Sequence, residues 1–200
     1  MQAIVEVAQR DHWQCRIAAV ISNRADAEGL IFATQHGIPT VVVPSKEFSS
    51  RDSFDAALQS AVDRFTPDLL VLAGFMRILT AQFVDRYAGR LLNIHPSLLP
   101  SFPGLATHRQ ALAAGVKVHG ATVHFVTADL DHGPIVAQAA IPVLASDTEQ
   151  SLSERVLTEE HALYPQAVRW CLDGLVHLVD GRVRLDTAAQ PDPLFLKVTA

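Results

Sequence analysis

The segment Leu91-Leu-Asn-Ile-His-Pro-Ser-Leu-Leu-Pro-Ser-Phe-Pro-Gly104 joins a short apolar strand to a loop rich in proline. Asn93 and His95 are two residues apart, so their side chains point to the same face of an extended backbone. Pro96 denies His95 a helical conformation and ends the regular hydrogen bonding of the strand. We therefore expect an amide donor and an imidazole side by side at the carboxyl end of a strand, where open α/β sheets bind ligands.

The sequence on both sides of this segment alternates between buried strands and amphipathic helices. Apolar runs at 16–21, 40–43, 69–73 and 91–94 predict strands, and periodic segments at 1–10, 25–36, 49–65, 80–87 and 106–114 predict helices. This alternation is typical of a doubly wound, mostly parallel α/β sheet. Alternating segments at 120–127 and 134–143, joined by a short loop, predict an antiparallel hairpin at the edge of that sheet.

The last part of the chain predicts one long helix and a second hairpin. The helix is expected over 147–171, with Pro165 kinking or interrupting it. The second hairpin is expected around Asp180-Gly181, whereas Pro191-Asp-Pro193 carries no clear pattern.

Composition limits the kind of protein this can be. The 200 residues are 49% hydrophobic and 18% charged, which is normal for a folded α/β protein and argues against disorder. A net charge of −5 argues against a nucleic-acid or membrane-surface partner. Cys15 and Cys171 form no framework, and the start of the chain has no secretory pattern, so we expect a cytoplasmic protein with free thiols.

Three strings in the middle of the chain resemble a known family. Asn93-Ile-His-Pro-Ser-Leu-Leu-Pro100, the pair Pro103-Gly104 and Thr107-His-Arg-Gln-Ala-Leu112 are similar to the signature of the folate-dependent formyltransferases. Within that family the chain is most similar to the enzymes that formylate glycinamide ribonucleotide in purine synthesis. The resemblance implies a Rossmann-like formyltransferase fold in one catalytic domain over 1–200. Residues 1–95 would form a nucleotide-binding-like half, 96–175 the folate and catalytic half, and 176–200 a tail.

The resemblance assigns the catalytic roles to Asn93, His95 and Asp131. Asp131 lies in Asp129-Leu-Asp-His-Gly-Pro134, where a carboxylate taken alone is a turn former, but the segment is similar to the one that carries the family's essential aspartate. A nearby carboxylate favours the cationic form of an imidazole. The expected chemistry is direct attack of the substrate amine on the formyl carbon of 10-formyltetrahydrofolate, with Asn93 and His95 stabilising the oxyanion. Asp131 would relay the proton to the leaving nitrogen.

The resemblance also implies two sets of binding residues. Those that hold the folate co-substrate would be Arg51, Met76, Arg77, Ile78, Leu79, Asn93, Thr127, Ala128, Asp129 and Leu130. Those that contact the ribonucleotide would be Gly74, Phe75, Pro96 and Glu160. Without the resemblance, Arg51 and Glu160 are exposed helix residues, and Ile78 and Leu79 simply seat a helix.

We expect no metal, although the chain has nine histidines. His119 and His124 are five residues apart and so lie on opposite faces of a strand. His108, His132 and His161 have no cysteine or carboxylate at ligand spacing. The expected partners are therefore small molecules alone, and the chain would be a monomer or a homodimer.

The chain departs from the family pattern at its start. The family opens with a strand and a glycine-rich loop before its first helix, and here Met1 falls where that helix begins. The missing strand would lie in mid-sheet, and the missing loop would bind the substrate phosphate at a helix N-terminus. We therefore expect the chain as printed to be less stable and to bind the ribonucleotide weakly, and about a dozen upstream residues to raise both properties.

Three alternatives remain at this point. A hydrolase that deformylates 10-formyltetrahydrofolate shares the Asn-x-His…Asp constellation, but usually carries an N-terminal regulatory domain. Methionyl-tRNA formyltransferase shares it too, but has a large additional domain and a basic surface, unlike this short acidic chain. A folate- or nucleotide-binding protein without turnover is conceivable because of the absent phosphate loop.

Overall fold

The structure, a computed structural model, describes residues 1–186 and 194–196. The segment Pro191-Asp-Pro193 lies outside the described residues. The first half of the chain forms α1 (Gln2–Arg10), β1 (Val20–Ser22), α2 (Glu28–Gln35), β2 (Thr40–Val42), η1 (Ser45–Glu47), α3 (Arg51–Asp63), β3 (Leu70–Leu72), α4 (Ala81–Arg86) and β4 (Leu91–His95). The second half forms α5 (Thr107–Ala114), β5 (Val118–Phe125), β6 (Ile135–Pro142), α6 (Glu149–Leu172), β7 (Val176–Val179), β8 (Arg182–Leu185) and β9 (Leu194–Leu196).

The main sheet has the strand order β3-β4-β5-β6-β9. Strands β3 and β4 are parallel, and β5 and β6 form the antiparallel hairpin that the alternating pattern predicted. The prediction that this hairpin is the edge was wrong in one respect, because β9 pairs with β6 in parallel and lies beyond it. The second predicted hairpin is also present, as β7 and β8.

Strands β1 and β2 pair with each other in a separate parallel sheet. In the part of the chain that the structure describes, neither pairs with β3. Side chains of the two sheets nevertheless share one apolar cluster, in which Ile21 and Val41 pack against residues such as Leu91 and Phe83. The expectation that the chain as printed folds less stably stays a prediction.

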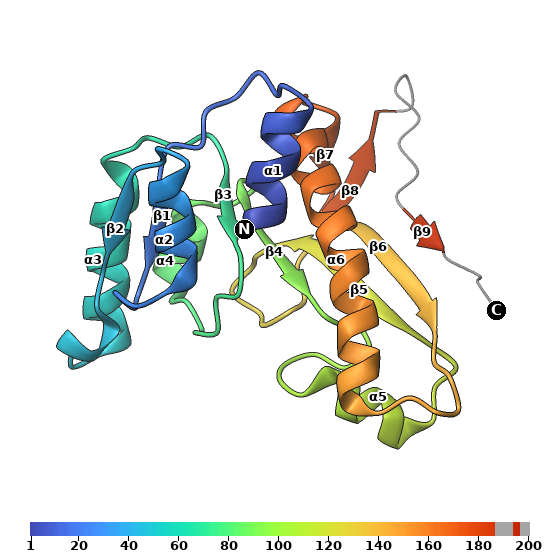
Figure 1. Ribbon diagram of the computed structural model, residues 1–200. Coiled ribbons are helices and arrows are strands. Elements are labelled where there is room, and N and C mark those ends of the chain that lie inside the picture. Colours follow the sequence, from blue (N-terminus) through green and yellow to red (C-terminus); the bar gives the residue numbers. More distant parts are fainter. Residues whose placement is uncertain (187–193, 197–200) are drawn as a thin grey trace.

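Helix α6 covers one face of the main sheet, with α1 beside it (Figure 1). Its buried residues Leu152, Val156 and Leu163 belong to the same apolar cluster as Val123 of β5 and Val136 of β6. The side chain of Thr148 caps the first turn by accepting a hydrogen bond from the Ser151 backbone N–H. The buried apolar side chains along α6 are the reason why this helix packs against the sheet.

Pro165 lies inside α6 and does not interrupt it. Proline has no N–H to donate to the carbonyl of His161, which normally weakens a helix. Here Leu163, Tyr164 and Ala167 are buried against the sheet on both sides of the proline. Tertiary packing therefore maintains the helix, and the prediction of an interruption was wrong. Within the described residues no helix is both long and apolar enough to cross a bilayer.

Candidate active site

Asn93 and His95 lie at the carboxyl end of β4, as the strand pattern predicts. In the ladder with β5, Asn93 is opposite His124 and His95 is opposite Thr122. The His95 side chain is only 8% exposed. Asn93 is half-buried, so its amide can reach a ligand from the surface.

A buried polar network holds the loop that follows His95. The Thr122 hydroxyl donates to the Ser97 carbonyl at 2.7 Å and accepts from the Leu99 N–H at 3.0 Å. The Gln138 amide donates to the Leu99 carbonyl at 2.9 Å and to the Thr122 hydroxyl at 3.0 Å. Because both the N–H and the carbonyl of Leu99 are hydrogen-bonded, the loop after β4 has a defined conformation.

The path of this loop brings the Phe102 carbonyl to the His95 ring. Its Nε2 lies 3.0 Å from the Phe102 carbonyl, which can only accept, so Nε2 carries a hydrogen. The other nitrogen, Nδ1, lies 3.5 Å from Oδ2 of Asp131. In a neutral ring Nδ1 would turn a lone pair toward the carboxylate, whereas in the imidazolium it has a hydrogen there. The Phe102 carbonyl and the Asp131 carboxylate therefore lie at the two nitrogens of the ring.

Asp131 is brought to His95 by the turn between β5 and β6. Its backbone is left-handed, with φ of 55°, a conformation that aspartate tolerates better than most residues. Oδ2 accepts the Gly104 N–H at 2.8 Å, which ties the turn to the loop after β4. Oδ1 lies 3.9 Å from His124 Nε2, too far for a hydrogen bond, and so keeps the capacity to accept a proton.

His124 is a site residue that sequence reasoning missed. Its Nδ1 donates to the Phe125 carbonyl at 2.9 Å, so in the neutral ring Nε2 is an acceptor. Asn93 Nδ2 lies 3.4 Å from that Nε2, which turns the amide NH₂ group of Asn93 toward the site. Burial lowers the pKa of His124, which keeps this ring neutral. Only the register of β4 against β5 could have revealed this pairing.

Two further histidines form a pair beside the same loop. His119 Nε2 lies 3.2 Å from His108 Nδ1, and the Phe102 ring meets the His119 ring edge-on. Burial, and then the neighbouring His108, lower the pKa of His119 to about 4. The His119 Nδ1 atom is buried without a hydrogen-bond partner among the described residues.

The segment after β3 presents apolar side chains to solvent. Met76 and Ile78 are 81% and 54% exposed, whereas Leu79 is buried. The guanidinium of Arg77 lies 4.6 Å above the Phe54 ring of α3. The Asp55 carboxylate accepts the Thr80 N–H at 2.6 Å, so α3 contacts this segment at Arg77 and at Thr80.

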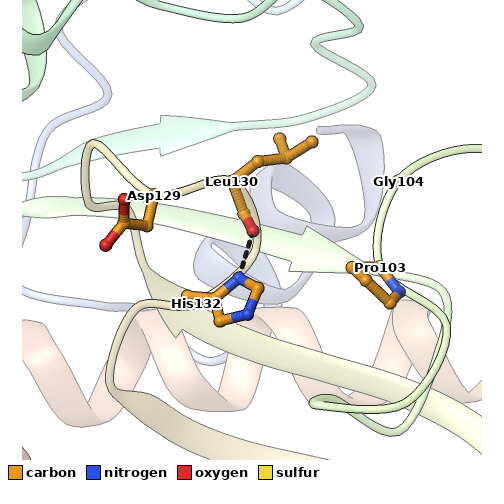
Figure 2. Close-up of a pocket in the computed structure, with 5 residues that line it drawn as sticks. All are labelled: Pro103, Gly104, Asp129, Leu130 and His132. Carbon is orange, nitrogen blue, oxygen red and sulfur yellow. Dashed lines mark hydrogen bonds between the residues drawn. The ribbon is translucent and has the colours of Figure 1, made fainter.

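A pocket of about 540 Å³ lies between the turn that carries Asp131 and the loop after β4 (Figure 2). It is lined by Pro103, Gly104, Asp129, Leu130 and His132. Asp129 and Leu130 are two of the predicted folate contacts, and Gly104 is the residue whose N–H holds Asp131. The pocket therefore adjoins Asp131.

The remaining predicted residues lie on several segments of the fold. Thr127 bonds the Asp129 carbonyl at 3.2 Å, Ala128 is exposed, and Gly74 and Phe75 follow β3. Pro96 follows His95 directly, whereas Arg51 is an exposed residue in the first turn of α3. Among the described residues neither Arg51 nor Glu160 bonds to the three catalytic candidates.

Glu160 lies on α6, where burial raises the pKa of its carboxyl to about 7. The Met1 amino group opposes this shift, so the two groups are close in space. No group of three or more histidine, cysteine or carboxylate side chains in the described ranges could hold a metal ion.

The chain is similar to known proteins over nearly its whole length. The Formyl transferase family matches residues 1–168. Phosphoribosylglycinamide formyltransferase of Escherichia coli is 48% identical over 191 residues, which cover 96% of this chain and 90% of that protein.

Solved structures give the same result. The phosphoribosylglycinamide formyltransferase of Coxiella burnetii superposes with a TM-score of 0.87 at 48% identity, over 92% of this chain and 87% of that one. A formyltetrahydrofolate deformylase of Pseudomonas syringae gives a TM-score of 0.84 at 32% identity, over 92% of this chain but only 61% of that one. The chain belongs to the Formyl transferase family.

Proposed function

We propose that this enzyme transfers the formyl group of 10-formyltetrahydrofolate to the amine of glycinamide ribonucleotide. One observation carries the proposal: the His95 imidazole, the Asp131 carboxylate and the Asn93 amide converge on the end of β4, from two segments far apart in the sequence. Relatives that share nearly the whole chain are phosphoribosylglycinamide formyltransferases.

The first step is attack of the uncharged amine nitrogen on the formyl carbon, which forms a C–N bond and leaves negative charge on the formyl oxygen. The Asn93 amide has a second N–H beyond the one turned to His124, and His95, two residues further along β4, is the second group placed to stabilise this charge. One well-placed donor of this kind is usually worth about 3–4 kcal/mol in the transition state. The Nδ1···Oδ2 distance of 3.5 Å is longer than an ordinary hydrogen bond, so Nδ1 is not committed to Asp131.

The second step breaks the bond between the formyl carbon and N10 of the folate. One proton must leave the attacking nitrogen and one must reach N10. Oδ1 of Asp131 has no close hydrogen-bond donor in the described part of the chain, so it can accept a proton. The carboxylate accepts the proton from the attacking nitrogen and donates it to N10, directly or through a water. No bond to the protein forms in either step.

The pocket beside Asp129 and Leu130, together with the exposed Met76 and Ile78, supports a folate site on this side of the molecule. A flat pterin suits exposed backbone groups with apolar walls. The half-buried Glu160 supports a contact with the glycinamide part of the ribonucleotide. Both substrates are metabolites of the cytoplasm, where we place the enzyme.

Deformylation of the same folate is the second candidate, because deformylase structures share the fold. The transferase is favoured since this chain covers 87% of the Coxiella transferase chain but 61% of the Pseudomonas deformylase chain, at lower identity.

Incubation with 10-formyltetrahydrofolate, with and without glycinamide ribonucleotide, tests the proposal through the absorbance of the released folate. Release that requires the ribonucleotide is the expected result. Release without it would select the deformylase, and binding of folate without release would select a protein that does not turn over.

A further inference from the structure

Tyr164 of α6 makes an unusual contact with the main sheet. The residue is 4% exposed and lies in the apolar cluster between α6 and the sheet. Its hydroxyl oxygen lies 2.7 Å from the Leu72 carbonyl and 3.1 Å from the Leu92 carbonyl. Leu72 is the last residue of β3, and Leu92 directly precedes Asn93.

A phenylalanine would fill the same space without removing a hydroxyl from water. Burying a phenol is favourable only when its O–H finds a hydrogen-bond partner. The role of this hydroxyl therefore depends on which groups accept its hydrogen bond. Leu72 is in register with Asn93 on parallel strands, so one O–H bridges both strands at the place where they enter the site. Burial raises the pKa of Tyr164 well above 10, and the group stays a donor.

Glu160 lies one helical turn before Tyr164, on the same side of α6. Its charge contributes to the raised pKa of the Tyr164 hydroxyl, which shows that the two groups are near each other. Figure 1 shows α6 lying over β5 and β6, and the helix also contacts β4. The tyrosine therefore connects the helix that carries Glu160 to the strand that carries Asn93.

We propose that Tyr164 is a positioning residue, whose hydroxyl fixes α6 against the ends of β3 and β4 and so sets Glu160 relative to Asn93 and His95. This inference rests on the proposed function, in which Glu160 contacts the ribonucleotide and Asn93 the formyl oxygen. The reacting nitrogen and the oxyanion donors then keep the separation that attack requires. Misplacement of reacting groups by about 1 Å can cost on the order of 100-fold in rate.

The test compares Tyr164→Phe with Tyr87→Phe, because the chain has two tyrosines. Tyr87 is also fully buried as a residue, and its hydroxyl donates to Asp63 at 2.8 Å, in the cluster on the other side of the molecule. Both variants should melt a few degrees lower than the parent enzyme. Only Tyr164→Phe should lower kcat, by about tenfold, with the KM for 10-formyltetrahydrofolate unchanged within twofold.

A second variant keeps a donor at the same place. With 4-aminophenylalanine at position 164, an N–H replaces the O–H, and kcat should return to within about threefold of the parent value. Equal kcat in the two phenylalanine variants would overturn the inference, as would a folded 4-aminophenylalanine variant with the low kcat. Absence of ribonucleotide-dependent release in the parent enzyme would instead refute the proposed function.

Discussion

At the scale of single residues, the proposed chemistry depends on how His95 is held between the Phe102 carbonyl and the Asp131 carboxylate. The loop carbonyl of Phe102 orients Nε2, and Asp131 lies beside Nδ1. These contacts leave the ring little freedom to rotate. A change at either His95 or Asp131 should therefore affect turnover more than binding.

His95→Ala and Asp131→Asn should each reduce kcat by about 10²–10⁴-fold, because oxyanion stabilisation and proton transfer act only in the transition state. The KM for 10-formyltetrahydrofolate should change less than threefold. Steady-state kinetics with both substrates check this. His36→Ala, at an exposed histidine after α2, is the matched control and should leave both constants unchanged. Loss of folate affinity with unchanged kcat in either variant would contradict the assignment.

His124→Phe should lower kcat by about tenfold, or ~1.4 kcal/mol, which is the size of one neutral hydrogen bond. The phenylalanine fills the space of the buried ring but cannot accept from Asn93. His124→Gln has a carbonyl that can accept, and should retain more activity than the phenylalanine variant. Similar kcat values in the two variants would show that His124 does not orient Asn93.

The sequence predicted the pair Asn93 and His95 from alternation along a strand, and it predicted Asp131 only through the resemblance to a family. It did not predict His124, because a strand partner depends on a register that no local pattern encodes. The contact between His95 and the Phe102 carbonyl was equally out of reach, since it depends on the path of an irregular loop.

At the scale of elements, the turn between β5 and β6 is packed so closely that it admits no side chain at Gly133. A Cβ atom added there would lie 1.7 Å from the Phe125 carbonyl oxygen, whereas one at Gly29 would meet only the flexible end of Met1 at 3.2 Å.

Gly133→Ala should therefore destabilise the protein by about 3 kcal/mol or more, as overpacking against backbone does. This corresponds to a melting temperature about 6–12 °C lower for a chain of this size. Because the turn carries Asp131, kcat should fall as well. Gly29→Ala, in the first turn of α2, is the control and should melt at or slightly above the parent temperature. Equal melting temperatures for the two variants would refute this close packing.

The buried His119 of β5, which contacts His108 of α5, should make the stability of the protein sensitive to acid. The folded state holds the pKa of His119 at about 4, below its usual value of 6.5, so the unfolded chain binds more protons between these pH values. This histidine therefore contributes stability at pH 7 that is lost as the pH falls from about 6.5 to 4. Glu160 acts in the opposite direction, since its raised pKa favours the folded state at low pH.

His119→Phe removes the titrating group and keeps a ring in contact with Phe102. Its melting temperature should depend less on pH between 6.5 and 4 than that of the parent. Calorimetric scans at several pH values measure this dependence. An equally steep dependence in both proteins would show that His119 is not responsible.

Most elements follow from local patterns, since strands and helices alternate as the apolar periodicity predicts. The exceptions have long-range causes. β9 forms because a segment far along the chain pairs with β6, and α6 passes through Pro165 because its neighbours are buried against the sheet. Neither the pairing nor the burial can be read from the residues nearby.

At the scale of the whole molecule, the site needs both halves of the chain. The strand that carries Asn93 and His95 precedes the proline-rich loop, and the turn that carries Asp131 comes after α5 and β5. Helix α6 packs against β4, β5 and β6 (Figure 1), and its Tyr164 hydroxyl contacts the Leu92 carbonyl, so these elements form one assembly. The central claim is that this assembly moves a formyl group between two bound molecules.

That claim is tested most directly with 10-formyltetrahydrofolate labelled with ¹³C in the formyl group. Carbon NMR follows the label in the presence of the enzyme and glycinamide ribonucleotide. The account predicts that the label appears as a formamide on the ribonucleotide, and that His95→Ala and Asp131→Asn slow its appearance. Label recovered as free formate would contradict the account.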